Sequence, residues 1–255
     1  MKFLKVSLFI IFLSLPSFAL YNTPMPVLDF DKSVIIETRL QDSPQKTATE
    51  NISFSKQNFQ NKDFIVAYDN IEQKMNGENY TSATIAYYKI NNNKLSAYSQ
   101  STEISKEGNP YQSLKLTFDW DNMTANFNIN DHEKGKSSAK TIKLSPKTFT
   151  VRGSFFYIQN LIKNKIKSDK IKMIVPNGDA FPMELNISYI PEEITIKDKK
   201  ISCLKVKITP SAGLFSSFVK PMYFWYKAEP PYSFVRYEGL ERGPNSPYII
   251  QEVLP

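Results

Sequence analysis

Alternating apolar and polar residues run through most of this chain. From Leu114 to Trp120 every second side chain is apolar, and after the pair Asp121-Asn122 a similar alternation runs through residues 123–129. A period of two is typical of a strand with one buried and one solvated face, and an Asp-Asn pair accepts the positive φ of a tight turn. This pattern predicts a β-hairpin.

The same period recurs along the rest of the chain. It predicts a second hairpin, from strands 85–90 and 95–99 around three asparagines, while the polar stretch 42–50 is interpreted as a loop. Further strands are predicted at residues 34–38, 64–68, 140–144, 171–175, 181–189, 193–197, 201–209, 222–227, 232–238 and 248–253. Many short strands with almost no helical intervals favour a mainly β fold, a curled antiparallel sheet in the form of a half-barrel or open barrel.

One segment has a helical period instead. Apolar residues recur every three or four positions between Ser154 and Lys167, namely at Phe155, Ile158, Leu161, Ile162 and Ile166. This spacing predicts one amphipathic helix over residues 154–167 that covers the apolar face of the sheet, with Gly153 or Ser154 near its N-cap. Because no Pro/Gly/Ser-rich linker interrupts the chain, we expect a single antiparallel β domain over residues 20–255.

The first nineteen residues have the pattern of a secretory signal peptide. A basic start at Lys2 and Lys5 precedes an apolar run over residues 6–15, and a small-x-small end follows at residues 17–19. Roughly ten apolar residues are too few for a membrane-spanning helix, which needs about twenty. We therefore expect cleavage after Ala19 and a free periplasmic or secreted protein, whose formal charge would fall from +7 to about +5 with the loss of two lysines.

Residues with catalytic chemistry are few. The only histidine, His132, lies in a polar loop, and the only cysteine, Cys203, lies in a predicted strand where a buried thiol is expected. The eight glycines form no phosphate-binding loop, and the mild positive charge indicates no nucleic-acid partner. We expect no enzymatic activity, no metal and no cofactor; a hydrolase that uses His132 or a pair of acidic residues is the less favoured alternative.

Aromatic residues are the more informative feature. An apolar, loop-like segment over residues 213–219 is followed at once by the aromatic run of residues 223–226. Such rings can line a cavity for an apolar ligand, or they can fill an ordinary core. The candidate ligand-binding residues are Phe155, Ile158, Leu161, Ile162, Leu214, Phe215, Phe218, Trp225 and Arg236, with Arg236 as the anchor of an acidic head group.

Residues 80–255 resemble the bacterial exported domain-of-unknown-function family 3108. The resemblance rests on the order of the hairpin at 118–120, the helix at 155–166, the turn at Gly178-Asp179, and the strands with Trp225 and Arg236. It implies a shape similar to the half-barrels that carry lipoproteins across the periplasm, with a helix-lined apolar cavity. An acidic residue expected before the helix is absent from residues 150–154, so no role of such an acid is carried over.

Two functions from different classes follow. The first is a cell-envelope protein that binds a lipid or another hydrophobic ligand in the half-barrel. We expect such a protein to be a monomer that makes peripheral contact with a membrane. The second is a structural or protein-interaction component of the envelope, in which the same aromatic residues fill the core and partners bind at sheet edges.

The predicted signal peptide has a direct test. The intact mass of the protein recovered from the periplasm or the medium should correspond to a chain that begins at Leu20, because signal peptidase cuts after a small-x-small end. A full-length chain recovered from the cytosol would contradict the prediction.

Overall fold

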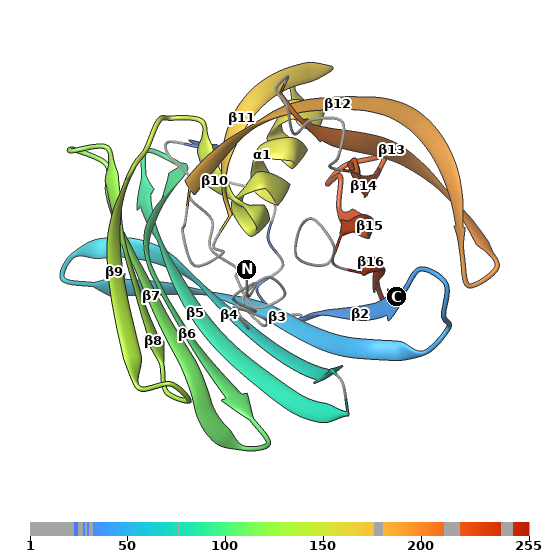
Figure 1. The fold of residues 1–255 in the computed structure, drawn as a ribbon. Coiled ribbons are helices and arrows are strands. Elements are labelled where there is room, and N and C mark those ends of the chain that lie inside the picture. The colour runs from blue at the N-terminus through green and yellow to red at the C-terminus, as the bar shows by residue number, and fades with distance from the viewer. Residues whose placement is uncertain are drawn as a thin grey trace.

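A computed structural model describes residues 23–24, 28, 30, 33–75, 77–175, 181–211, 220–240 and 247–254 of the chain. In these ranges it forms sixteen strands and one helix (Figure 1). Their bounds are β1 Thr23–Pro24, β2 Val34–Leu40, β3 Lys46–Phe59, β4 Lys62–Met75, β5 Glu78–Asn91, β6 Lys94–Lys106, β7 Asn109–Asp119, β8 Thr124–Asp131, β9 Lys136–Lys143, β10 Thr148–Thr150, α1 Val151–Lys163, β11 Ser168–Val175, β12 Phe181–Ile196, β13 Lys199–Pro210, β14 Met222–Lys227, β15 Phe234–Leu240 and β16 Tyr248–Val253.

All of these strands belong to one sheet. Along the sheet the order is β10 to β16, then β2 to β9, with β1 paired beside β6. Strands β9 and β10 follow each other along the chain but lie at the two edges, so the sheet is open. It curls around α1, which lies inside the curve in Figure 1. The predicted fold class is confirmed: a mainly β, antiparallel, open sheet with one helix.

Both predicted hairpins form with the expected faces. In β7 and β8, Leu114 lies opposite Ile129 and Leu116 opposite Phe127, and all four side chains are buried. The turn between β5 and β6 is made by Asn92 and its neighbour at position 93, with φ of 49° and 57°. Asparagine accepts this left-handed conformation more readily than most residues, which is why the asparagine run marks the turn.

The helix begins and ends earlier than predicted. It spans Val151–Lys163, so Ser154 lies inside its first turns and not at the N-cap. Strand β10 pairs in parallel with β11, the single parallel pair among the described strands, and runs directly into the helix. At the other end Lys165 has a φ of 57°, its N–H donates to Ile162 O, and the N–H of Ile166 donates to Leu161 O. This is a Schellman motif, which ends a helix regardless of the apolar period.

Two further expectations from the sequence are wrong. The polar stretch 42–50 is not all loop, because β3 starts at Lys46 and buries Ala48 and Glu50. The strands predicted at 181–189 and 193–197 are one continuous strand, β12. Pro191 does not break this strand. The pairing of β12 with β11 ends at Ser188, so no strand lies beside Pro191 on that edge to require the N–H that proline lacks.

The core fills the space between the sheet and α1. One cluster of buried apolar side chains extends from β3 to β16 and includes Ile158, Leu161 and Ile162 of the helix. A smaller cluster of Cys203, Trp225 and Val235 lies apart from it.

Gly239 is required by the ring of Tyr237. Both residues are on the same face of β15, and the Tyr237 hydroxyl donates to Leu240 O at 3.0 Å. The ring lies along the strand, so a Cβ at position 239 would collide with the Tyr237 hydroxyl and ring carbons. The strand can therefore hold only glycine here while the ring keeps its place.

Replacing Gly239 with alanine should lower the free energy of unfolding by about 1–3 kcal/mol, the usual cost of an overpacked contact. Urea denaturation followed by circular dichroism measures it. In a Tyr237→Ala background the same Gly239→Ala change should be nearly neutral, because the colliding ring is gone. Equal costs in the two backgrounds would contradict this account.

Candidate functional site

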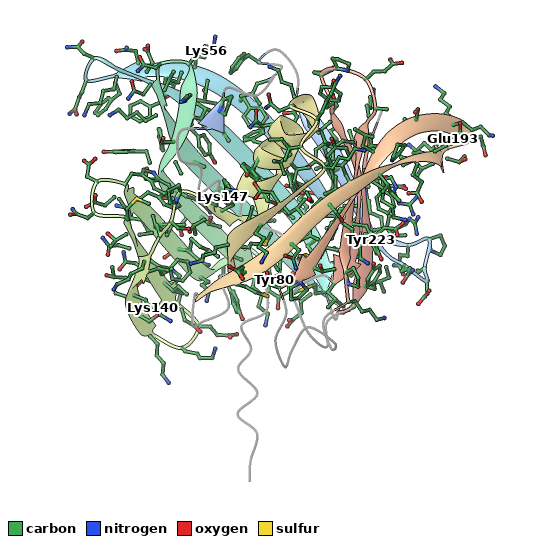
Figure 2. All side chains as sticks on the ribbon, turned by 90° about the horizontal axis from the view of Figure 1, so that it is seen from above. Lys56, Tyr80, Lys140, Lys147, Glu193 and Tyr223 are labelled. Carbon is green, nitrogen blue, oxygen red and sulfur yellow. The ribbon has the colours of Figure 1, made fainter. Side chains whose placement is uncertain are left out.

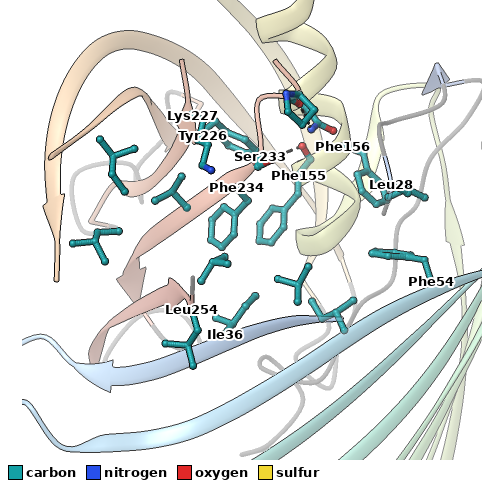
Figure 3. Close-up of a pocket in the computed structure, with 18 of the residues that line it drawn as sticks. Leu28, Ile36, Phe54, Phe155, Phe156, Tyr226, Lys227, Ser233, Phe234 and Leu254 are labelled. Carbon is teal, nitrogen blue, oxygen red and sulfur yellow. Dashed lines mark hydrogen bonds between the residues drawn. The ribbon is translucent and has the colours of Figure 1, made fainter. Parts of the chain in front are cut away.

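An apolar cavity of about 1040 Å³ lies beside α1 (Figure 3). Its walls come from α1, from β2 and β3, from the end of β16, from β14 and β15 with their connection, and from the tip of the β12–β13 hairpin. The volume is at the upper end of the range of about 300–1,000 Å³ that small-molecule sites have. Its apolar lining comprises Leu28, Phe30, Val34, Ile36, Ile52, Phe54, Phe155, Phe156, Ile196, Ile201, Phe234, Val235, Val253 and Leu254.

Aromatic rings of α1 form one wall. The ring of Phe155 stacks on Phe234 at a centroid distance of 5.1 Å and meets Phe224 edge-on at 5.3 Å. Its neighbour Phe156 lies 6.2 Å from Phe54 of β3. Figure 3 shows the Phe155–Phe234 pair in the middle of the site and Phe54 at one side. These contacts join the helix to both halves of the sheet and leave apolar faces turned toward the cavity.

A β-bulge sets the position of Phe234. The register of β14 and β15 shifts between Trp225 and Tyr226, so Val235 is an extra residue. As a result Phe234 and Tyr237, three positions apart, both pack against the main core. Bulges commonly re-aim side chains next to binding sites in this way.

Gln159 holds the helix to the connection between these strands. Its side-chain amide donates to Pro231 O at 2.6 Å and to Tyr232 O at 3.2 Å. Gln159 lines the cavity, but both hydrogen bonds go to the backbone of the wall. We expect this residue to shape the site and not to recognise a ligand.

Three lysines give the lining its positive charge. Lys197 and Lys199 flank the β12–β13 turn, and Lys227 ends β14. All three are exposed, and none forms an ion pair with another residue of the described ranges. Asp198, at the turn itself, is not part of the lining. The lining is therefore mostly apolar, and its positive charge comes from the tip of the β12–β13 hairpin and from the end of β14.

A family model described as a protein of unknown function (DUF3108) matches residues 72–241, two thirds of the chain. The chain belongs to this family. Neither the curated proteins nor the solved structures contain a match to it. The matched range runs from within β4 to just past β15, so it includes the helix wall and the three lysines, whereas β2, β3 and β16 contribute their wall from outside it.

Only one of the four predicted site residues of α1 lines the cavity in this DUF3108 protein. Phe155 lines the cavity. Ile158, Leu161 and Ile162 are 1%, 2% and 3% exposed and pack in the main core instead. Around a helix of 3.6 residues per turn, Ile158 and Ile162 lie only about 60° and 20° from Phe155, so they share its side of α1 and differ from it in their place along the helix axis.

Trp225 and Arg236 are not among the residues that line the cavity, and Trp225 packs in the smaller cluster with Cys203 and Val235. The indole N–H of Trp225 donates to Glu192, and the Lys205 ammonium and the Arg236 guanidinium lie 5.1 Å and 5.6 Å from its ring centroid. Arg236 also forms ion pairs with Glu238 and with a second carboxylate, that of Glu252. With its charge already balanced, Arg236 is not the residue that gives the cavity its positive charge.

The other predicted site residues, Leu214, Phe215 and Phe218, lie outside the residues that the structure describes.

The candidates for catalysis are isolated. His132 is exposed in the β8–β9 turn, where its Nε2 lies 3.2 Å from Ser113 Oγ. Cys203 is fully buried, and this burial raises the pKa of its thiol. The described residues hold no group of three or more His, Cys, Asp or Glu side chains that could bind a metal ion.

The one described helix is too short and too polar to cross a membrane.

Sequence reasoning missed most of the lining. Ile36 and Leu254 lie in or beside predicted strands, but a period of two says only which residues share a face, and no strand is predicted around Phe54. The lysines had a weak signal, since Lys197 and Lys199 surround a turn-forming aspartate. Nothing local to them indicates that this turn reaches a cavity.

A buried polar wall adjoins the cavity on the inner face of β3–β6. The lining residue Ile52 lies opposite Asp69, whose neighbours across the next strands are Thr84 and Thr102. The two threonine hydroxyls are 2.9 Å apart. Asp69 is 1% exposed, and neither of its carboxylate oxygens has a hydrogen-bond partner. Burial therefore raises the pKa of Asp69 well above its usual value.

Asp69→Asn should stabilise the protein at neutral and alkaline pH. Because the folded-state pKa of Asp69 is raised, the protonated form is favoured on folding; this contribution is full below the ordinary pKa of 3.8 and is lost as the pH rises through the folded-state value. The melting temperature of Asp69→Asn should therefore exceed that of the wild type at pH 8 by about 2–4 °C per kcal/mol gained, and the difference should shrink toward pH 4.

Glu72→Gln is the matched control, since Glu72 is exposed on the same strand. It should leave both melting curves nearly unchanged. An Asp69→Asn protein that is less stable than the wild type at pH 8 would show that the carboxylate makes a favourable interaction, against this account.

Proposed function

We propose that this protein is a binding protein, not an enzyme, and that it holds the apolar chain of an amphiphile in the cavity beside α1. The observation that carries the proposal is the composition of the lining, which is mostly apolar and whose charged members are the three lysines Lys197, Lys199 and Lys227. Ligand sites have this composition, with many apolar walls and a few polar groups that fix orientation.

The apolar part suits a hydrocarbon chain. Transfer of apolar surface out of water contributes about 25 cal/mol per Å², so a chain of several methylene groups would bind tightly without hydrogen bonds. The aromatic wall of Phe155 and Phe234 is already held by ring stacking. A ligand would therefore meet a largely preformed surface, which lowers the entropy cost of binding.

The three lysines suit an acidic head group. Lys197, Lys199 and Lys227 border the cavity, and no carboxylate is among the described residues that line it. A carboxylate or phosphate beside these lysines would gain hydrogen bonds to ammonium groups, which are stronger than neutral ones. We assign the head group to these lysines, in place of Arg236.

The proposed place of work is the periplasm or the outside of the cell, as a monomer. The leader over residues 1–19 supports export. A cavity formed entirely by one chain supports a monomer, since no second copy is needed to complete its lining.

The cavity can be tested with cis-parinaric acid, a fluorescent fatty acid. The wild type should bind it, and Val253→Trp, which puts a large ring into the cavity, should weaken binding at least about tenfold. Lys199→Glu should lower the affinity for the acid about tenfold. It should leave the affinity for an uncharged long-chain alcohol, measured by competition, nearly unchanged.

Each variant has a control in the same chain. Ile190→Trp adds the same ring at a position that is 61% exposed and outside the lining, and Lys200→Glu reverses the lysine next to Lys199 that does not line the cavity. Both should bind like the wild type. Absence of probe binding by the wild type, or equal losses in variants and controls, would refute the proposal.

A further inference from the structure

A second apolar surface lies on the side of β4–β6 that faces away from the core. It is formed by Phe59, Phe64, Ile85, Tyr87 and Tyr98, here named the aromatic surface. Phe59 is 65%, Tyr98 49%, Ile85 39% and Tyr87 36% exposed. The ring of Phe64 lies beneath them, 5.4 Å from Tyr98 and 6.3 Å from Tyr87.

Strand register explains why these residues face outward. On β4, Ile65 and Ala67 point into the main core, so Phe64 points to the opposite side. A register shift between Tyr87 and Tyr88 makes Tyr98 an extra residue of β6 and brings its ring onto Phe64. The strands therefore fix the positions of the exposed rings on one face of the sheet, where Tyr87 and Tyr98 both pack on Phe64.

Lysines surround the aromatic surface. Lys62 lies directly opposite Phe59 and Lys89 directly opposite Phe64. Lys94 lies at the same end of the strands, whereas Lys56, opposite the core residue Ile65, points to the inner face of the sheet at that end, where Figure 2 shows it projecting. None of the four forms an ion pair with another residue that the structure describes.

Acidic residues are few at this end. Across residues 56–64 and 87–98 the sequence has four lysines and one acid, Asp63. That carboxylate accepts a hydrogen bond from Asn58 Nδ2 at 2.7 Å. On the same strands Glu72 lies opposite Thr81, and Glu103 opposite Ala83, both farther from the lysines. The surface is thus aromatic at its centre and positive at its rim.

We propose that the aromatic surface docks on a lipid bilayer that carries anionic head groups. Tyrosine is enriched at the interface of membranes because its ring enters the apolar layer while its hydroxyl stays among the head groups. Each lysine beside it raises the affinity of the protein for an anionic leaflet about fivefold. An apolar patch of this kind on a monomer marks an interaction site, and its charge selects an anionic partner.

Lys56 belongs to the cavity side of this end of the sheet. Lys56 Nζ is 4.9 Å from the ring centroid of Phe30, and Phe30 lines the cavity while 37% exposed. Phe54, two residues before Lys56 on the same face of β3, lines it as well. The aromatic surface lies on the opposite face of the sheet, so the docking does not depend on the cavity holding a ligand.

Co-sedimentation of the processed protein with vesicles tests the docking. Phosphatidylcholine vesicles with about 30 mol% phosphatidylglycerol should bind the wild type in low salt, and pure phosphatidylcholine vesicles should bind it far more weakly. Lys62→Ser with Lys89→Ser should lower the affinity on the order of 20-fold. Tyr87→Ser with Tyr98→Ser should also lower it, with the circular dichroism melting curve retained.

Lys136→Ser with Lys143→Ser is the control for net charge. Both lysines are exposed on the edge strand β9, so their loss removes the same charge elsewhere and should leave vesicle binding unchanged. Equal losses in this control, or no binding of the wild type to anionic vesicles, would overturn the proposal.

The cavity variant Val253→Trp separates this proposal from the proposed function. It should still bind vesicles, because Val253 is not part of the aromatic surface. Loss of probe binding with vesicle binding intact shows two separate sites. Vesicle binding lost in Val253→Trp, with its fold retained, would show that membranes are bound through the cavity, which contradicts docking by the aromatic surface.

Discussion

The antiparallel pairing of β16 with β2 is the contact on which the rest of the structure depends. It joins strands more than 200 residues apart, from Ile249 opposite Leu40 to Val253 opposite Ile36. Inside the pair, Gln251 Nε2 donates to Thr38 Oγ1 at 3.2 Å, and both residues are buried. Without this pairing the sheet would be two separate sheets, and Ile36, Val253 and Leu254 would not share a wall. Such a distant contact carries a large loop-closure cost, so we expect the pairing to form late in folding.

The open sheet explains why the helix lies inside and not on the outside. A curled sheet that does not close leaves an apolar concave face, and α1 fills part of it with Ile158, Leu161 and Ile162. The helix spans only thirteen residues, and its aromatic wall meets β3 and β15 through Phe156 and Phe155. The volume beyond this wall remains as the cavity. The first turns of α1 therefore supply the lining residues Phe155 and Phe156, while Ile158, Leu161 and Ile162 stabilise the core.

Two features of the molecule favour function over stability. The buried carboxyl group of Asp69 has no hydrogen-bond partner, and the aromatic surface keeps large rings in contact with water. Selection for stability alone would remove both, because each is destabilising or invites association. Features of this kind cluster at functional regions: Asp69 lies beside the cavity residue Ile52, and the aromatic surface lies on the opposite face of the same strands.

The sequence by itself determined most of the strands, the antiparallel hairpins and the existence of one helix, because alternation and helical spacing are local properties of the chain. It also placed Phe155 among the cavity candidates, but it could not separate Phe155 from Ile158, since both are apolar and only the packing of α1 against the sheet divides them. The end of the helix at Lys163 was set by a Schellman motif, and the continuity of β12 through Pro191 by the missing neighbour on one side. The cavity and its lysines were decided by tertiary structure alone, because the pairing of β16 with β2 and the bulge at Val235 bring together residues that share no local pattern.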